Sequence, residues 1–399
     1  MFASGVLLMI ISAYTTLMTR KTFFQNLALL TTTLLLLFFA GEIFFRFYSV
    51  SPNKDLKLYK NSDLVTFEHK PNATAIHGPD GFGPDHEAFS KPQVRINNLG
   101  LRGPNTTVGK PENTIRVALF GDSFTYGMIV DQEKIFSKLL QDRLNNELSM
   151  RTGKKYEVLN FGIVGQTVDQ YYVTLKNKAF AFSPDIVIVN YFAGNDASEF
   201  RRHEWITNEN GELIKVKDIL HYANENGELL RLGVEKPISQ LISNVVFRGK
   251  LLLDKVGVRL KQPRILWSNF LNPEHPWGDP EISNYYEKAN EMLLKIKELN
   301  DDNDIETLVT IIPADFQVNE KYLSKYPGNP YDEPEFDLTM PQRIVGEFTT
   351  SHSIPTLDLL PIFKKDPRDL YWLKNDPHFT EEGHEVMAET LFNYVKSLY

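Results

Sequence analysis

Cysteine is absent from the 399-residue chain. Its absence excludes disulfide bonds, thiolate metal sites and a cysteine nucleophile together. The histidines His203, His221 and His275 are scattered along the chain without the paired spacing of metal ligands. Neither a Walker motif nor a dinucleotide-binding glycine motif is present. We therefore expect neither a metal nor a cofactor.

An excess of basic residues is also missing, because the formal net charge is -8. A general nucleic-acid-binding protein needs a basic face, so this class of partner is not expected. The composition, with 42% hydrophobic and 24% charged residues, is typical of a globular protein and not of a disordered or collagen-like one. The length allows one large domain or two ordinary ones.

The N-terminal region has long apolar runs. Residues 1–18 are mostly apolar, and a stronger run over residues 22–45 follows the basic pair Arg20 and Lys21. At about 1.5 Å per residue, the second run is long enough to cross a bilayer of about 30 Å. It lacks the cleavage site of a signal peptide, so residues 1–48 are predicted to be a retained membrane anchor. The alternatives are a signal peptide or a buried helix.

Arg20 and Lys21 indicate the direction of this anchor. Basic residues beside a membrane span stay preferentially on the cytoplasmic side, so the chain after residue 48 is predicted to be extracytoplasmic. Residues 1–18 have two open interpretations: a second membrane span, or a stretch before a natural start at Met18. Both place the main domain on the same side. We expect a single-pass or two-pass membrane protein.

A polar lead-in covers residues 49–114, which are rich in proline, glycine and asparagine and have no helical period. It ends in residues 95–104, which are typical of a short strand followed by a turn. We expect the lead-in to pack on the domain that follows.

From residue 115 onward, short apolar runs alternate with segments of helical periodicity. Strands are predicted at residues 115–120, 156–161, 185–192, 306–312 and 355–360. Helices are predicted at residues 133–148, 168–182, 282–299, 341–350 and 381–398. This alternation predicts an α/β fold with a mainly parallel sheet covered on both faces. A functional site is expected beyond the carboxyl ends of the strands.

Residues 198–280 interrupt the alternation and are predicted to be an insertion. Residues 205–216 contain an Asn-Gly pair and resemble a β-hairpin. Residues 236–264 hold seven Lys or Arg against one Asp, together with several leucines. This segment is either an ordinary helical insertion with a solvated basic face, which we favour, or an amphipathic lid near anionic lipid.

Ser123 is the candidate nucleophile, in a Gly-Asp-Ser tripeptide that directly follows the first predicted strand. A serine hydroxyl reacts only when a base removes its proton and hydrogen-bond donors stabilise the resulting oxyanion. A serine at a strand-to-helix turn lies at the sheet edge, close to backbone N–H groups. The tripeptide alone is a weak signal, because it is common.

The candidate base is His378, which lies shortly before the closing helix. Asp376 is placed to accept a hydrogen bond from one ring nitrogen and leave the other facing the serine. Thr380 is typical of the cap of that helix, so His378 would lie on an anchored loop. The alternative interpretation is that His378 is a helix-capping or surface histidine without a catalytic role. His384, inside the helix, is expected to be structural.

Donors for an oxyanion are available on the other strand ends. Asn195 follows the third predicted strand between Gly194 and Asp196, and its side-chain NH₂ can point at a developing negative charge. Gly165, after the second strand, and Ser123 can each supply a backbone N–H.

The ordered blocks around Ser123, Gly165, Asn195 and His378 resemble those of the SGNH (GDSL) hydrolase superfamily. The resemblance covers residues 115–399 and implies a three-layer α/β/α sandwich similar to flavodoxin. It further implies that Ser123 is the nucleophile, that His378 is the base, and that Gly165 and Asn195 belong to the oxyanion hole together with the Ser123 N–H.

The final block departs from the family pattern. The family usually has aspartate three residues before the histidine, and this chain has Asn375 there. Asp376, two residues before His378, matches the acid partner only if its carboxylate approaches by a different loop path. This shorter spacing is similar to that of exopolysaccharide acetyltransferases.

In the lead-in, the resemblance places Asn97, Asn98 and Arg102 beside the site. A structural turn whose arginine contacts the backbone is an equally open interpretation.

Three functions follow from the resemblance. The first is an extracytoplasmic esterase or deacetylase that acts on lipid or on an acylated glycan. The second is an O-acyltransferase that modifies a cell-surface polysaccharide, with a membrane-bound acyl donor protein as partner. The third is a membrane-tethered binding module without catalysis. The sequence does not identify the acyl group or the acceptor.

Overall fold

The computed structural model describes residues 20–47, 57–76, 92–219, 221–223, 229–231, 270, 281–325, 337–373 and 376–399. The first apolar run at residues 1–18, the basic segment at residues 236–264 and Asn375 lie outside the described residues. The chain divides into two compact units. One comprises residues 1–50 with 233–260, and the other comprises residues 51–232 with 261–399.

The described part of the first unit is helix α2 (Arg20–Phe47). Its segment Thr22–Ala40 has a mean hydropathy of 1.8, and none of it is buried in the protein. The hydroxyls of Thr31 and Thr33 donate to the carbonyls four residues earlier, at 2.9 and 2.8 Å, so they need no water. The helix is thus long and apolar enough to serve as a membrane span or as a signal sequence.

A five-stranded parallel sheet forms the centre of the second unit, in the order β13-β12-β7-β5-β6. Its strands are β5 (Thr114–Gly121), β6 (Lys155–Asn160), β7 (Ile186–Phe192), β12 (Glu306–Ile312) and β13 (Thr356–Asp358). Every residue of β5 and β7 is buried, because helices cover both faces of the sheet. The predicted α/β fold with a parallel sheet is confirmed.

The predicted strand at residues 355–360 is too long. Strand β13 ends at Asp358, whose carboxylate accepts a hydrogen bond of 3.0 Å from the backbone N–H of Leu360. Helix α11 (Leu360–Lys365) begins there with a proline in its first turn. This local turn at Asp358 and the proline therefore start a helix where the apolar run predicts strand.

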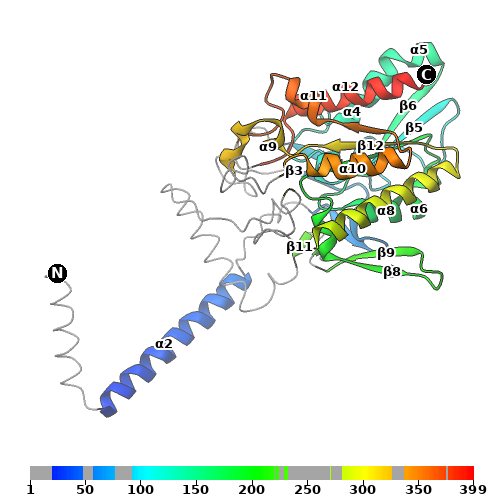
Figure 1. The fold of residues 1–399 in the computed structure, drawn as a ribbon. Helices are drawn as coiled ribbons and strands as arrows, with labels where there is room; N and C mark the ends of the chain where they lie inside the picture. The colour runs from blue at the N-terminus through cyan, green and yellow to red at the C-terminus, as the bar shows by residue number, and fades with distance from the viewer. Residues whose placement is uncertain are drawn as a thin grey trace. The chain divides into compact units, whose positions relative to one another are not determined.

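The other helices are α3 (Ser123–Tyr126), α4 (Phe136–Glu147), α5 (Ser149–Thr152), α6 (Val168–Asn177), α8 (Ile282–Asp301), α9 (Asp315–Val318), α10 (Met340–Ser351) and α12 (Glu381–Ser397). Short 3₁₀ helices are η2 (Ala179–Phe182), η3 (Ser198–Arg202) and η5 (Glu320–Lys325). Figure 1 shows α4 and α12 together on one side of the sheet and α6, α8 and α10 on the other.

The single helix predicted at residues 168–182 is divided between α6 and η2. Lys178 leaves the helical backbone region, with φ -131° and ψ -49°. Its ammonium group reaches Glu68 at 3.1 Å, in the lead-in. The tertiary contact therefore accompanies a break that the periodic pattern does not indicate.

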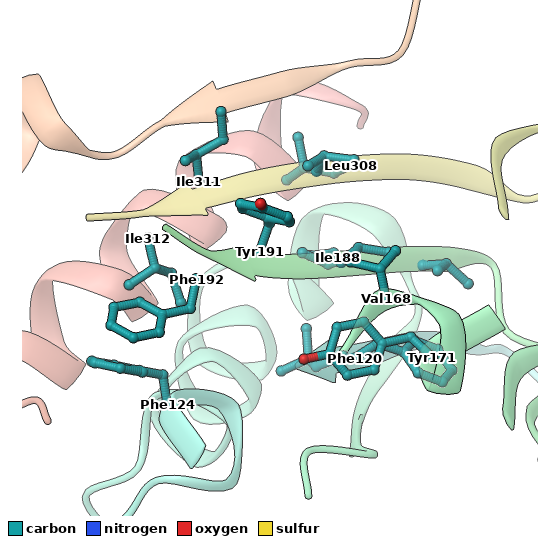
Figure 2. Close-up of a cluster of buried hydrophobic side chains, with 14 of the residues drawn as sticks. Phe120, Phe124, Val168, Tyr171, Ile188, Tyr191, Phe192, Leu308, Ile311 and Ile312 are labelled. Carbon is teal, nitrogen blue, oxygen red and sulfur yellow. The ribbon is translucent and has the colours of Figure 1, made fainter. Parts of the chain in front are cut away.

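Figure 2 shows the core between the sheet and one helical layer, where Ile188 and Tyr191 of β7 lie beside Leu308 of β12. Val168 and Phe120 fill the space below these strands and are also buried. Burial of each such side chain contributes roughly 1.5–3 kcal/mol. The sheet edge that carries the site therefore rests on a tightly packed base.

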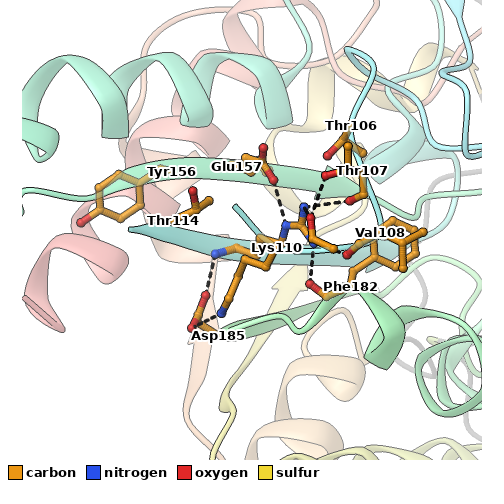
Figure 3. A network of polar contacts seen from close by, with 12 residues as sticks. Thr106, Thr107, Val108, Lys110, Thr114, Tyr156, Glu157, Phe182 and Asp185 are labelled. Atoms are coloured by element: carbon orange, nitrogen blue, oxygen red, sulfur yellow. Dashed lines mark hydrogen bonds and ion pairs between the residues drawn. The ribbon is translucent and has the colours of Figure 1, made fainter. Parts of the chain in front are cut away.

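Strand β5 also contains a fully buried arginine, Arg116. Its guanidinium group pairs with Glu157 at 2.8 Å and donates to the carbonyls of Val108 and Phe182 at 2.7 Å each. The backbone N–H of Arg116 donates to Asp185 at 2.7 Å. Figure 3 shows this network at the start of the strand, where it joins the end of the lead-in to β5, β6 and the residue before β7.

The lead-in contains more regular structure than the sequence predicts. It forms two antiparallel strand pairs, β1 (Tyr59–Ser62) with β2 (Thr66–His69), and β3 (Thr74–Ile76) with β4 (Gln93–Arg95). Phe67 is buried in a second apolar cluster that includes Ile163, and its carbonyl accepts from Gln166 Nε2 at 3.2 Å. Strands of three or four residues carry too few positions for a clear alternating pattern.

The hairpin predicted at residues 205–216 is present, as β8 (His203–Thr207) paired with β9 (Leu213–Asp218). Its turn uses Gly211, which has φ +78°, a backbone conformation that glycine adopts without strain. A further short pair joins β10 (His221–Ala223) and β11 (Leu229–Arg231).

Candidate active site

Ser123 lies at the first residue of α3, immediately after strand β5. The carboxylate of Asp122 accepts a hydrogen bond of 2.9 Å from the backbone N–H of Phe124, which caps this short helix. A Cβ on Gly121 would lie 2.0 Å from Thr125 Oγ1, so the turn can be this tight only with glycine. The sequence thus presents the serine hydroxyl at the carboxyl end of the sheet.

His378 faces Ser123 across the sheet edge. Its Nε2 lies 2.7 Å from Ser123 Oγ, and its Nδ1 lies 2.8 Å from Asp376 Oδ1. The same carboxylate oxygen also accepts the backbone N–H of His378 at 2.8 Å. The carboxylate of the shorter Asp-x-His spacing thus folds back on its own loop and still reaches the ring.

The imidazole of His378 lies against an aromatic cluster. The ring of Phe124 lies 5.0 Å from it, measured between centroids, and Phe192 and Phe379 pack on Phe124 at 4.2 and 4.7 Å. The Phe124 ring thus covers one part of the histidine, whose side chain is 14% exposed. The closing helix α12 begins three residues after His378, and the Thr380 side chain caps it by accepting the N–H of Gly383 at 3.2 Å.

Gly165 lies on the loop between β6 and α6, which is joined to the nucleophile turn by its backbone. The N–H of Ile163 donates to the carbonyl of Gly121 at 3.1 Å, and Asn160 Nδ2 donates to the carbonyl of Thr125 at 2.7 Å. A Cβ on Gly162 would lie 2.4 Å from the backbone nitrogen of Tyr126. The loop and the nucleophile turn therefore form one tightly packed unit.

Asn195 follows β7, and two buried carboxyl groups lie beside it. Burial raises the pKa of Asp122 to about 6, although hydrogen bonds from Phe124 and from the Asn195 side chain lower it. Burial, and then the charge of Asp122, raises the pKa of Asp196 well above its usual range. Asp196 Oδ2 accepts from the N–H of Phe192 at 2.8 Å, which fixes the loop that carries Asn195.

The three loops converge because their strands are adjacent. Strand β5 pairs with β6 on one side and with β7 on the other, and all three run in the same direction. Ser123, Gly165 and Asn195 follow the carboxyl ends of these strands. The predicted site residues from β5, β6 and β7 are thus brought to one edge, where His378 meets the serine.

Arg102 in the lead-in contacts the loop that follows the nucleophile helix. Its guanidinium group donates to the carbonyls of Tyr126 and Val130 at 2.6 Å each, and it also contacts the carbonyl of Gly127. The residue is fully buried, so it fixes this loop in a dry environment. These contacts fit both interpretations of the arginine, because it binds backbone groups and does so beside the site.

Asn97 and Asn98 have structural partners. Asn97 Oδ1 accepts from the N–H groups of Leu99 and Leu101 at 2.9 and 3.0 Å. Asn98 Nδ2 donates to the carbonyl of Thr106 at 2.9 Å. Both asparagines organise the turn that precedes Arg102.

His384 has the structural position expected of it. It is buried in α12, its Nδ1 accepts from the N–H of Phe136 at 3.2 Å, and burial lowers its pKa to about 3. The described ranges contain no group of three or more His, Asp or Glu side chains placed to hold a metal ion.

Arg202, in the insertion, is a residue of this neighbourhood that sequence reasoning missed. Its guanidinium group contacts the carbonyl of Gly165 from η3. No local sequence pattern marks an arginine for such a role.

The family model for GDSL-like Lipase/Acylhydrolase matches residues 117–391. An acetyl xylan esterase, AlAXEase, resembles 70% of this chain over 100% of its own, with 15% identity and a TM-score of 0.38. A GDSL-like lipase from Bacteroides thetaiotaomicron resembles 71% of this chain over 89% of its own, with 14% identity and a TM-score of 0.31. A lipase/acylhydrolase from Enterococcus faecalis resembles 71% over 96%, with 15% identity and a TM-score of 0.36. No curated protein sequence matches the chain.

Proposed function

Because the chain belongs to the GDSL-like lipase/acylhydrolase family, an ester-hydrolysing family, we propose that it cleaves acyl esters with Ser123 as nucleophile. In this proposal His378 is the general base, Asp376 orients it, and the acyl group comes from a lipid or from an acylated glycan outside the cytoplasm. The observation that carries the proposal is the continuous chain of contacts from Asp376 through His378 to Ser123.

The first half-reaction forms an acyl-enzyme. As Ser123 Oγ attacks the ester carbonyl carbon, His378 Nε2 takes its proton across the 2.7 Å contact. The Asp376 carboxylate accepts from Nδ1, which fixes the tautomer and stabilises the imidazolium that forms. When the tetrahedral intermediate collapses, the imidazolium returns the proton to the departing alcohol.

An oxyanion develops on the former carbonyl oxygen. The N–H groups of Ser123 and Gly165 and the side-chain NH₂ of Asn195 are the donors that we assign to it. Each follows the carboxyl end of one of three adjacent strands, which supports a common target. A preorganised donor of this kind lowers the barrier by roughly 3–4 kcal/mol.

The second half-reaction depends on the acceptor. Water, activated by neutral His378, would release the acid and restore Ser123. A polysaccharide hydroxyl in its place would make the protein an O-acyltransferase. The Asp-x-His spacing and the apolar helix α2 favour this second candidate, because they fit a surface-tethered acetyltransferase. Release of free acetate from an aryl ester, with no acetyl transfer to an added oligosaccharide, would favour hydrolysis.

Labelling with a fluorophosphonate tests the nucleophile. We expect the wild type to be labelled and the variant Ser123→Ala not to be. Ser351→Ala is the matched control, since Ser351 Oγ also lies beside a histidine, 3.0 Å from His352 Nδ1, but on an exposed helix end. Equal labelling of the wild type and Ser123→Ala would contradict the assignment. If the wild type is not labelled, and cells that carry Ser123→Ala have the same phenotype as wild-type cells, the result would favour a binding module.

The extracytoplasmic placement can be tested directly because the chain contains no cysteine. Met150 is 91% exposed, so Met150→Cys introduces a single accessible thiol on the catalytic domain. We expect a membrane-impermeant maleimide to label this variant on intact cells, with wild type as the unlabelled control. Labelling that occurs only after lysis would place the domain in the cytoplasm.

A further inference from the structure

One arginine of the insertion after β7 contacts the loop that contains Gly165. Arg202 ends η3, its side chain is 9% exposed, and its Nη2 contacts the carbonyl oxygen of Gly165, 37 residues earlier. The guanidinium group lies against the glycine itself, since a Cβ on Gly165 would be 3.4 Å from the same nitrogen. The contact is therefore made to the loop that carries a proposed oxyanion donor.

The remaining nitrogens of this guanidinium group lie beside carboxylates. Nη1 pairs with Glu199, and Nε lies 3.1 Å from Asp218 Oδ2. The carbonyl of Arg202 accepts the N–H of Ile219 at 2.9 Å. Because its side chain is only 9% exposed and lies beside two carboxylates, the arginine has little rotamer freedom left, so it presents a fixed donor to Gly165.

The next residue of the same segment holds the other end of the loop. His203 Nδ1 lies 2.9 Å from a carboxylate oxygen of Asp169, in the first turn of α6. Trp205 Nε1 donates to the same carboxylate at 2.7 Å. The segment from η3 into β8 thus contacts both Gly165 and Asp169. Between these two residues the chain passes from the β6 loop into α6.

The contact with Arg202 restricts the backbone conformation of Gly165. Its φ is +75°, in the left-handed region, and glycine is the residue with the most backbone freedom to lose. Fixing its carbonyl restricts ψ of Gly165 and, through the short loop, the direction of its N–H. A donor misplaced by about 1 Å can reduce the rate by roughly 100-fold.

We propose that Arg202 is a positioning residue that holds the Gly165 N–H in the orientation needed by the oxyanion. This inference rests on the proposed role of Gly165 in ester cleavage. The charge of Arg202 is offset by Glu199 and Asp218, so its contribution is geometric more than electrostatic. The 3₁₀ helix η3, which lies in the insertion and outside the central sheet, thereby contributes to the proposed oxyanion site.

The test uses the full-length protein in detergent with an aryl acetate as substrate. We expect Arg202→Met to lower kcat by about 10- to 100-fold, with KM within about threefold of the wild type. Inactivation by a fluorophosphonate should slow by a similar factor, since its phosphoryl oxygen would occupy the same donors. Arg202→Lys should recover part of kcat, because one ammonium group can still donate to the Gly165 carbonyl.

The matched control is Arg201→Met, which removes an exposed arginine from the neighbouring position and should leave kcat unchanged. A purely structural role for Arg202 would lower the folded fraction and leave kcat per folded molecule intact. A folded Arg202→Met protein with wild-type kcat and inactivation rate would therefore overturn the inference. Loss of ester cleavage in Ser123→Ala in the same experiment would leave the proposed function standing.

Glu199→Gln provides a second test of the positioning role if Arg202→Met does not fold. This change keeps the shape of the side chain and removes the charge that holds Nη1. We expect kcat to fall by about two- to tenfold with KM retained. An unchanged kcat in this variant would count against the positioning role.

Discussion

Asp376 accepts two hydrogen bonds from His378 on a single carboxylate oxygen, one from the backbone N–H and one from ring Nδ1, each at 2.8 Å. The first bond closes a tight local turn, and the second orients the imidazole. The two-residue spacing is therefore geometrically sufficient, because the side chain bends back along its own loop.

Asp376→Asn should separate these two contacts. The amide oxygen can still accept the backbone N–H, so the turn and the fold should persist. The amide cannot stabilise the imidazolium, and we expect kcat to fall by roughly 10³- to 10⁴-fold with little change in KM. Asp369→Asn, at an exposed carboxylate on the same segment, is the control. A loss below about tenfold for Asp376→Asn would show that another group orients His378.

The parts of the fold that sequence could predict are those with a strong local pattern. Strand β12 (Glu306–Ile312) has the predicted bounds, because all of its residues after Glu306 are buried and most of them are β-branched. The closing helix is one residue shorter than predicted and begins at its expected threonine cap. The convergence of Ser123, Gly165 and Asn195 at one edge follows from strand direction alone.

The parts that could not be predicted depend on contacts between distant segments. The paired strands of the lead-in have three or four residues each and are stabilised by packing against residues such as Ile163. Arg202 finds its partner 37 residues earlier, and the buried Arg116 finds Phe182 66 residues later. A charged side chain in a sequence resembles any solvated one until the fold surrounds it.

The buried guanidinium group of Arg102 should contribute strongly to stability. In Arg102→Met, the carbonyls of Tyr126 and Val130 lose donors at 2.6 Å, and no water can easily replace them. We expect the free energy of unfolding to fall by about 3–5 kcal/mol, since each buried unpaired acceptor costs about 1–3 kcal/mol. Urea unfolding followed by tryptophan fluorescence measures the change.

Arg95→Met is the matched control for this arginine. The Arg95 side chain is 58% exposed and pairs with Glu133, which is also exposed, so its loss should cost no more than about 0.5 kcal/mol. Equal effects of the two substitutions would contradict the structural role of Arg102.

Gly162→Ala should disturb the contact between the β6 loop and the nucleophile turn. The added Cβ would lie 2.4 Å from the backbone nitrogen of Tyr126, and neither backbone can move independently. We expect a loss of about 1–3 kcal/mol of stability and a lower kcat, because the Ser123 turn must shift. Gly346→Ala in α10 meets nothing within 4 Å and should stabilise by about 0.5–1 kcal/mol. A Gly162→Ala protein with wild-type stability and kcat would show that the loop is not constrained in this way.

His384 should make the stability of the protein depend on pH. Burial lowers its pKa from 6.5 to about 3, so the folded state keeps the ring neutral while the unfolded chain takes up a proton below 6.5. Its stabilising contribution is present above pH 6.5 and is lost as pH falls toward 3, at up to about 1.4 kcal/mol per pH unit.

His384→Gln keeps an acceptor for the N–H of Phe136 and should reduce the slope of unfolding free energy against pH in that window. His69 is buried with a similarly low pKa of about 3, so part of the slope should remain. An equal slope in His384→Gln and wild type would show that His384 is protonated in the folded protein.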